Sequence, residues 1–119
     1  MQVVNLLEKF SLIEKTWTPG IVGELNGQYV KLAKLQGEFL WHAHPDEDEL
    51  FLVVKGGFTM HFRDGSRALR EGEMIIVPRG VEHKPEAQAE AWVLLFEPVS
   101  TGHTGTVQSE RTVENQRWL

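Results

Sequence analysis

Hydrophobic residues along this chain are gathered into short runs of strand length, and residues that favour turns separate the runs. The runs are rich in β-branched and aromatic side chains and cover Tyr29–Leu35, Leu50–Val54, Phe58–Phe62, Met74–Val77 and Ala91–Phe96. The breaks carry glycine, asparagine, aspartate or proline and are Asn26-Gly27, Lys55-Gly56-Gly57, Asp64-Gly65, Glu71-Gly72 and Pro78-Arg79-Gly80. This spacing predicts an all-β barrel or sandwich.

Local signals add a hairpin, a helix and a tail to this pattern. Asp64-Gly65 favours a tight type I′ turn, which predicts a hairpin after the run that ends at Phe62. Near the start, Asn5 is a candidate N-cap for a short helix over Leu6–Phe10, the only helix we expect. The polar tail over residues 100–119 is expected to be irregular, with Trp118 able to hold its end against the barrel.

Two of the expected strands are apolar on both faces. Neither parity of Leu50–Val54 or of Ala91–Phe96 contains a polar residue. A small barrel has one interior, so the second face has to be covered by another sheet, a terminal segment or another subunit. We therefore expect a homodimer.

Length and composition limit the class of protein. A chain of 119 residues with 41% hydrophobic residues can build one core and is too short for two, which predicts a single domain over residues 1–119. No apolar run approaches the roughly 20 residues that cross a bilayer, and the start of the chain lacks a signal segment, so a soluble cytoplasmic protein without a membrane partner is expected. The net charge of −5 and the absence of a basic cluster argue against nucleic acid as a partner.

Three histidines and one glutamate are the candidate functional residues. His42 and His44 are two positions apart and can face the same side of an extended segment. Glu49 follows an acidic turn and starts the next predicted strand, and the turn at Pro78-Arg79-Gly80 precedes His83. Imidazole nitrogens and a carboxylate are ligands for divalent first-row metals, and the absence of cysteine excludes thiolate ligands. The four residues therefore predict one metal site.

The spacing of these residues resembles two motifs of the cupin superfamily. Residues 37–56 are similar to G-x5-H-x-H-x3,4-E-x6-G, and residues 72–87 are similar to G-x5-P-x-G-x2-H-x3-N. The first glycine is one residue closer to its histidine than in the family, and Ala87 replaces the last asparagine. The resemblance implies a single-domain double-stranded β-helix (jelly-roll) barrel, usually dimeric, whose metal-ligand positions are His42, His44, Glu49 and His83. Activities in this superfamily are very diverse.

Other polar residues have simpler interpretations. His61 alternates with Met60 and is expected to face outward, and His103 is expected in a solvated loop of the tail. The acids of residues 46–48 are expected to form a solvated turn, and Arg79 is interpreted as a surface residue.

Three functions are compatible with a nitrogen-rich site for one divalent transition metal, whether Fe, Mn, Ni, Zn, Cu or Co. The first is a metal-dependent enzyme that acts on a small organic molecule by dioxygenase or isomerase chemistry. The second is a non-catalytic module that binds a metal or small ligand, and the third is a barrel in which the metal only stabilises the fold. The sequence identifies no catalytic residue beyond the candidate ligands and no site for an organic cofactor.

Overall fold

The structure, a computed structural model, describes residues 1–119 and consists of one short helix and seven strands. The elements are α1 (Leu6–Phe10), β1 (Gly20–Leu25), β2 (Gln28–Glu38), β3 (Glu49–Lys55), β4 (Gly57–Phe62), β5 (Gly65–Arg70), β6 (Met74–Val77) and β7 (His83–Pro98). The predicted all-β class with a short N-terminal helix is confirmed. The side chain of Asn5 caps α1 by accepting a hydrogen bond from the backbone N–H of Glu8 at 3.0 Å.

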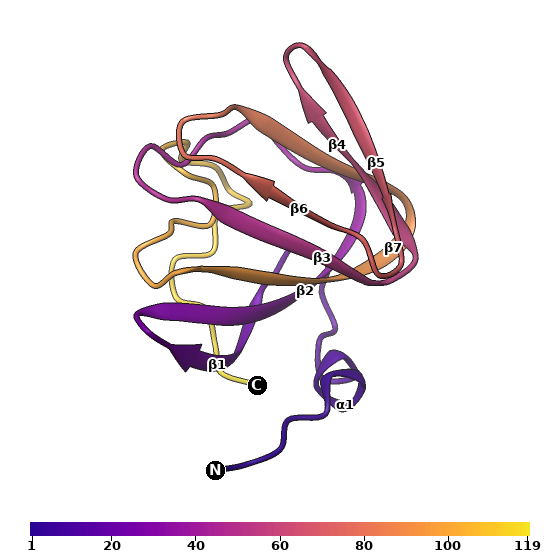
Figure 1. Ribbon diagram of the computed structural model, residues 1–119, viewed down its shortest axis with the longest axis vertical. Coiled ribbons are helices and arrows are strands. Elements are labelled where there is room, and N and C mark those ends of the chain that lie inside the picture. Colours follow the sequence, from indigo (N-terminus) through magenta and orange to yellow (C-terminus); the bar gives the residue numbers. More distant parts are fainter.

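Strand β7 lies at the centre of a single antiparallel sheet. One of its edges pairs with β2, and the other pairs with β4 near the start of β7 and with β3 near its end. The order β1-β2-β7-β3-β6 is extended by the β4–β5 hairpin, and the sheet curls so that its strands wrap around one interior (Figure 1). Sequence reasoning found only the apolar second half of β7 and did not predict β1. The first half of β7 is rich in polar residues and alanine, which have low strand propensity.

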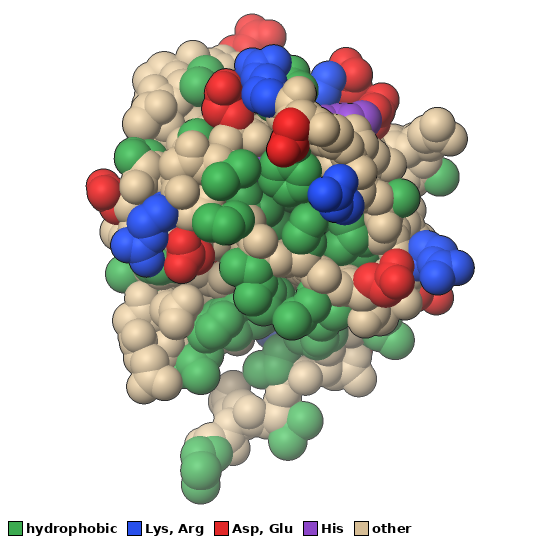
Figure 2. Space-filling model, turned by 45° about the horizontal axis from the view of Figure 1, so that its top comes forward, with side chains coloured by type: hydrophobic (Ala, Val, Ile, Leu, Met, Phe, Trp, Pro, Cys, Tyr) green, Lys and Arg blue, Asp and Glu red, His purple; other side chains and the backbone are tan.

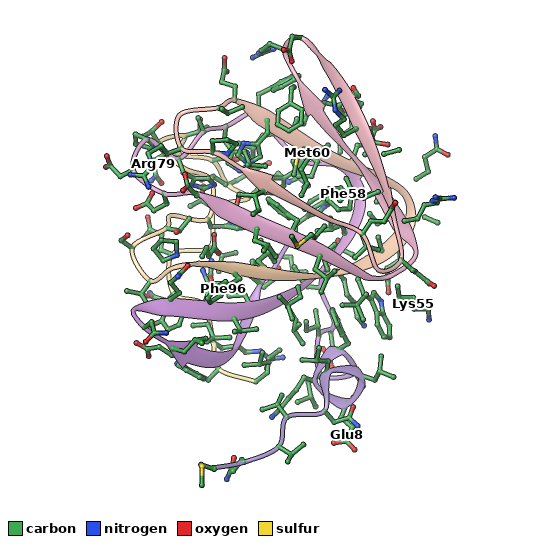
Figure 3. All side chains as sticks on the ribbon, viewed as in Figure 1. Glu8, Lys55, Phe58, Met60, Arg79 and Phe96 are labelled. Carbon is green, nitrogen blue, oxygen red and sulfur yellow. The ribbon has the colours of Figure 1, made fainter.

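The main core lies on the concave face of the sheet. Twelve buried residues form it, and Phe58 and Met60 of β4 point into the barrel from one side (Figure 3). A smaller cluster covers part of the outer face, where α1 places the ring of Phe10 against Trp92 of β7 at 4.8 Å. Burial on both sides explains why β7 is apolar at both parities in this region.

The rest of the outer face carries hydrophobic side chains, and of these only Leu94 packs against the cluster around Phe10. Leu50 of β3 lies directly between Ile76 of β6 and Phe96 of β7. One step along the strands, Leu52 lies between Met74 and Leu94. We call these six residues the apolar face. Met74 and Ile76 are 59% and 54% exposed, and Figure 2 shows hydrophobic side chains gathered over this side of the molecule.

The hairpins correct one prediction about turns. Phe62 pairs with Gly65, so the loop between β4 and β5 is formed by Arg63 and Asp64, and neither has the positive φ that a type I′ turn needs. The hairpin is therefore confirmed and its turn type is wrong. Asn26 and Gly27, with φ of 51° and 75°, form the connection between β1 and β2 that has the type I′ signature.

The C-terminal tail is irregular, as expected, yet it is fixed at both ends. Its last residues align with β1, where the N–H of Ile21 donates to the carbonyl of Arg117 and the N–H of Leu119 donates to the carbonyl of Ile21. Trp118 packs edge-on against Tyr29 at 5.9 Å but stays 58% exposed, so backbone pairing holds the end.

Further up the tail, Gly105 adopts a φ of +60° and packs against the backbone of Ala43, which lies between His42 and His44. The sole helix has five residues, so no helix in the structure could cross a membrane.

The Gly105→Ala variant is expected to detach this part of the tail. A methyl group at this position would overlap the carbonyl of Ala43, and the backbone conformation is one that alanine adopts at a cost. We expect a loss of about 1–3 kcal/mol in the free energy of unfolding, measured by urea denaturation, and faster proteolysis within residues 100–119. Gly102→Ala, at a neighbouring glycine without positive φ, is the control. Equal stability of the two variants would contradict the close approach of Gly105.

Candidate metal centre

Backbone pairing brings the two motifs together. His42 and His83 form an isolated antiparallel bridge in which each N–H donates to the carbonyl of the other, at 3.0 and 2.9 Å. The segment around His42 is not a regular strand, so this bridge and not a continuous ladder sets the direction of the side chains. Gly80, with φ +78°, donates its N–H to the carbonyl of His44 at 2.8 Å. The turn of the second motif is therefore hydrogen-bonded directly to the first motif.

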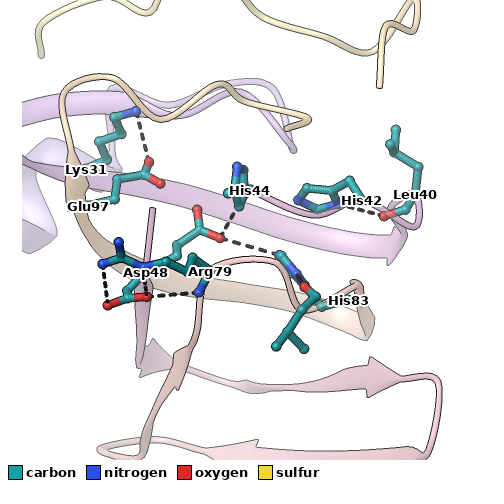
Figure 4. A network of polar contacts seen from close by, with 10 residues as sticks. Lys31, Leu40, His42, His44, Asp48, Arg79, His83 and Glu97 are labelled. Carbon is teal, nitrogen blue, oxygen red and sulfur yellow. Dashed lines mark hydrogen bonds and ion pairs between the residues drawn. The ribbon is translucent and has the colours of Figure 1, made fainter. Parts of the chain in front are cut away.

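The four predicted residues meet in the interior. Glu49 is the first residue of β3, as predicted, and His83 is the first residue of β7, whose first half was not predicted. The Oε1 atom of Glu49 lies 3.3 Å from Nε2 of His44 and 3.5 Å from Nε2 of His83 (Figure 4). All four side chains are buried, and one potential ligand atom from each lies within 4.8 Å of the others.

Hydrogen bonds to the rings of His42 and His83 set which nitrogen faces the centre. Nδ1 of His42 contacts the carbonyl of Leu40, and Nδ1 of His83 contacts the carbonyl of Val81, both at 2.9 Å. A carbonyl only accepts, so Nδ1 carries the proton and Nε2 keeps its lone pair. A hydrogen bond from Nδ1–H to a backbone carbonyl is typical of histidines that bind metals through Nε2.

The cluster leaves polar atoms unpaired in the interior. Nε2 of His44, Nε2 of His83 and Oε1 of Glu49 are buried without a hydrogen-bond partner. Burial, followed by the proximity of His83, lowers the pKa of His42 to about 4. A neutral imidazole has a lone pair available, so these unpaired atoms suit a metal cation. The donor set and its geometry are thus compatible with a metal site.

Beside this cluster lies a buried ion pair that sequence reasoning missed. Nζ of Lys31 on β2 is 2.9 Å from Oε1 of Glu97 on β7, and both side chains are about 95% buried or more. Lys31 shares the inward parity of Ala33, and Glu97 shares that of Leu95. The signal was present in the sequence as two opposite charges on the inward parity of otherwise apolar strands.

Glu97 also interacts with the ligand cluster. Burial by itself raises the pKa of Glu49, but the close contacts with Glu97, His44 and His83 hold this pKa well below its ordinary value. Burial and the negative charge of Glu49 raise the pKa of Glu97 well above its ordinary value, against the opposing effect of Lys31. The two neighbouring carboxyl groups therefore differ in acidity, and Glu49 is the stronger acid.

A cavity of about 40 Å³ opens beside the cluster. His42, Glu49 and Glu97 contribute polar groups, and the hydrophobic wall consists of Trp17, Pro19, Ala33, Leu35, Phe39, Phe51, Pro85, Val93 and Leu95. His103 of the tail also lines this cavity, so its prediction as a solvated loop residue is wrong. The error arose because the Gly/Thr-rich sequence around His103 gave no sign that the tail folds back over the barrel.

The other polar residues lie outside the cavity. His61 faces away from the core and contacts Ser66 and Glu86, each at 2.7 Å. Arg79 is exposed and pairs with Asp48 in the acidic turn, at 3.3 Å, as expected for a surface residue.

The sequence of this chain matches a protein-family model and a curated protein. A family model for the cupin domain matches residues 28–97. The chain is similar to the uncharacterized protein YdbB of Bacillus subtilis, with 35% identity over 81 residues, which cover 67% of this chain and 72% of that protein.

Solved structures show the same fold. A cupin-2 domain containing protein from Shewanella frigidimarina is 45% identical with a TM-score of 0.79, and the match covers 81% of this chain and 94% of that chain. Protein NMB1881 from Neisseria meningitidis is 34% identical with a TM-score of 0.75, and the match covers 82% of this chain and 99% of that chain. KdgF from Halomonas sp. is 24% identical with a TM-score of 0.59, covering 67% of this chain and 78% of that chain, and shows likeness of fold alone. The predicted jelly-roll barrel is therefore confirmed.

Removal of only one partner of the ion pair beside the cluster is expected to destabilise the protein. Lys31→Met leaves a buried carboxyl group next to Glu49, so we expect a loss of about 3–5 kcal/mol in the free energy of unfolding, measured in urea. The double variant Lys31→Met/Glu97→Leu should regain most of this loss, because neither charge then remains. Arg63→Met, which breaks the exposed pair with Glu82, is the control and should cost at most about 1 kcal/mol. A double variant as unstable as the single one would contradict the assigned pairing.

Proposed function

Because this chain belongs to the cupin domain family, we propose that His42, His44, Glu49 and His83 bind one divalent transition metal ion and that the protein is a metal-dependent enzyme acting on a small organic molecule. The observation that carries the metal site is the set of buried ligand atoms without partners. Three nitrogens and one oxygen suit Fe, Mn, Ni, Zn, Cu or Co, and the donor set alone does not choose among them.

The cavity beside the ligands supports an enzyme over a barrel that a metal merely stabilises. A purely structural site is enclosed by its ligands, whereas His42 and Glu49 here also line open space. Apolar walls with a few polar groups are typical of pockets for small organic ligands. A non-catalytic binding module would use the same pocket, and it would show saturable ligand binding without turnover.

The chemistry proposed is that of a dioxygenase or an isomerase. A bound metal with open coordination positions would supply Lewis-acid or redox chemistry to an oxygen-bearing substrate. The residues of the chain would hold the substrate against apolar walls and exclude water. Glu97 is placed to hold a proton beside the ligand cluster, at the one carboxyl group of the cavity that is not a candidate ligand.

We also propose that the protein forms a homodimer through the apolar face. The terminal segments cover only the part of the outer face near Trp92 and Leu94. The remaining rows across β6, β3 and β7 form a continuous hydrophobic surface, which a second copy could bury (Figure 2).

Removal of one ligand is expected to abolish metal binding. His83→Ala should weaken the affinity for Co²⁺ or Ni²⁺ by more than about 100-fold, measured by titration of the chelator-treated protein. His61→Ala is the matched control, because this histidine lies outside the cluster, and its affinity should equal that of the wild type. The wild type should bind one ion per chain and melt at a higher temperature when loaded.

The same variants test catalysis. The loaded wild type, purified without oxygen, is screened for oxygen consumption with diketones and catechols and for isomerisation of hydroxycarbonyl compounds by NMR. Any turnover found should disappear in His83→Ala and persist in His61→Ala. Turnover that survives the loss of the metal would refute the proposed mechanism, and saturable binding without turnover would favour the binding module.

A charge in the apolar face is expected to separate the dimer. Ile76→Lys places an ammonium group on the β6 side of the proposed interface, so light scattering after size exclusion should report half the mass of the wild type. Val107→Lys, in the tail, introduces the same charge at a 38% exposed residue outside the face and should remain dimeric. A wild type that is monomeric at micromolar concentration would contradict this proposal.

A further inference from the structure

The C-terminal tail contributes to the cavity although it lies outside the family match. That match ends at residue 97, and the tail follows from residue 100. Two tail residues, His103 and Gln116, line the inner cavity and also an outer cleft of about 330 Å³ between the tail and the sheet. They therefore form the partition between the cavity beside the metal ligands and the space outside.

His103 is held in a defined orientation. Its Nδ1 accepts a hydrogen bond from the backbone N–H of Val113 at 2.8 Å. Its ring packs on Phe39 at 5.2 Å, and Phe39 lies edge-on to His42 at 5.6 Å. Because Nδ1 accepts, the proton of the neutral ring must be on Nε2. Burial, assisted by the charge of Lys31, lowers the pKa of His103 to about 4, which keeps the ring neutral at neutral pH.

No group of the chain accepts from Nε2–H of His103, whose ring lines both the cavity and the outer cleft. Gln116 has a buried Oε1 atom without a partner, and so does Glu97 at Oε2. All three residues line the cavity, whose remaining wall is largely apolar. Unpaired polar groups around a cavity indicate where a ligand makes its hydrogen bonds.

We propose that His103 is a substrate-binding residue whose Nε2–H donates to an oxygen of the ligand while an adjacent oxygen of the same ligand binds the metal. The inference rests on the proposed metal site. The substrate class is a small molecule with two neighbouring oxygens, such as a hydroxycarbonyl compound or an enediol.

The dimensions of the cavity support a short ligand. A volume of about 40 Å³ holds about three water molecules, so only a short part of a ligand fits beside the cluster. In a cavity of this size, a ligand that contacts His42 and Glu49 on one side and His103 on the other carries its two polar atoms close together. The apolar walls from Leu35 and Phe51 would contact its carbon atoms.

Two substitutions separate the donor of His103 from its role in holding the tail. In His103→Asn the amide oxygen can take the place of Nδ1 and accept from Val113, but the side chain is too short to reach the ligand. In His103→Gln an amide N–H can take the place of Nε2, whereas the bond to Val113 is lost. Thr104→Val is a further control, because it removes the hydroxyl contact with Thr112 in the tail without changing the cavity lining.

The experiment uses the full chain loaded with Co²⁺ and two probes followed by the visible spectrum of the metal. Acetohydroxamate has two adjacent oxygens and is expected to reach His103, whereas azide binds only the metal. We expect His103→Asn to bind acetohydroxamate at least about tenfold more weakly than the wild type and azide within about twofold of it. His103→Gln and Thr104→Val should retain acetohydroxamate affinity even though their melting temperatures fall.

The outcomes distinguish this inference from the function on which it rests. Wild-type affinity for acetohydroxamate in His103→Asn, or an equal loss for both probes, would overturn the role of His103 and leave the metal site intact. A loss in all three variants that follows the fall in melting temperature would show that His103 only holds the tail, which also overturns it. Failure of the wild type to take up Co²⁺ would overturn the proposed metal function and the inference together.

Discussion

The antiparallel pairing of β7 is the constraint on which the rest of the structure depends. Its 16 residues contact β2 along one edge, and β4 and then β3 along the other, so one strand determines the register of three. The inward positions near its end supply core residues such as Val93 and the charged Glu97. Its first residue, His83, pairs with His42 and so fixes the distance between the two motifs. A shift of this strand by one residue would turn His83 and Glu97 away from the interior together.

The polar groups in the interior of the barrel carry a cost in folding free energy. A barrel of this size buries four potential metal ligands and an ion pair within an otherwise apolar core. Burial of polar atoms without partners is unfavourable, because their interactions with water are lost and not replaced. Neutral imidazoles reduce this cost, as the low pKa of His42 shows, and the ion pair between Lys31 and Glu97 offsets one of the buried charges. The arrangement is favourable for binding a cation because the same atoms that are unpaired in its absence would become ligands.

The fold class and the grouping of the four motif residues could be predicted from the sequence, whereas parts of the surrounding sheet and tail could not, for physical reasons. Four glycines of the two motifs have positive φ, and they are Gly37, Gly56, Gly72 and Gly80. Few other residues adopt this conformation, so the spacing of these glycines predicts the backbone geometry of the motifs. By contrast, the first half of β7 is a strand because of its neighbours and not because of its own propensity.

Lys31 and Glu97 could have been recognised from their inward parity, whereas their contact required the register of β2 against β7. The position of His103 depends on a fold of the tail that no periodic pattern encodes. The metal-ligand assignment itself stays a prediction, which the geometry of the cluster supports.

The tail and the strands hold their cavity-lining residues in place in different ways. The candidate metal ligands are held by strand ends, a backbone bridge and glycine turns, all of which are coupled to the core. The tail is held by a few contacts at Gly105, Val113 and Ile21 and has no regular pairing along most of its length. A substitution at His103 or Gln116 therefore changes the polar groups of the cavity without altering the register of any strand. We infer that the barrel sets where a metal would bind, whereas the tail determines which small molecule fits beside it.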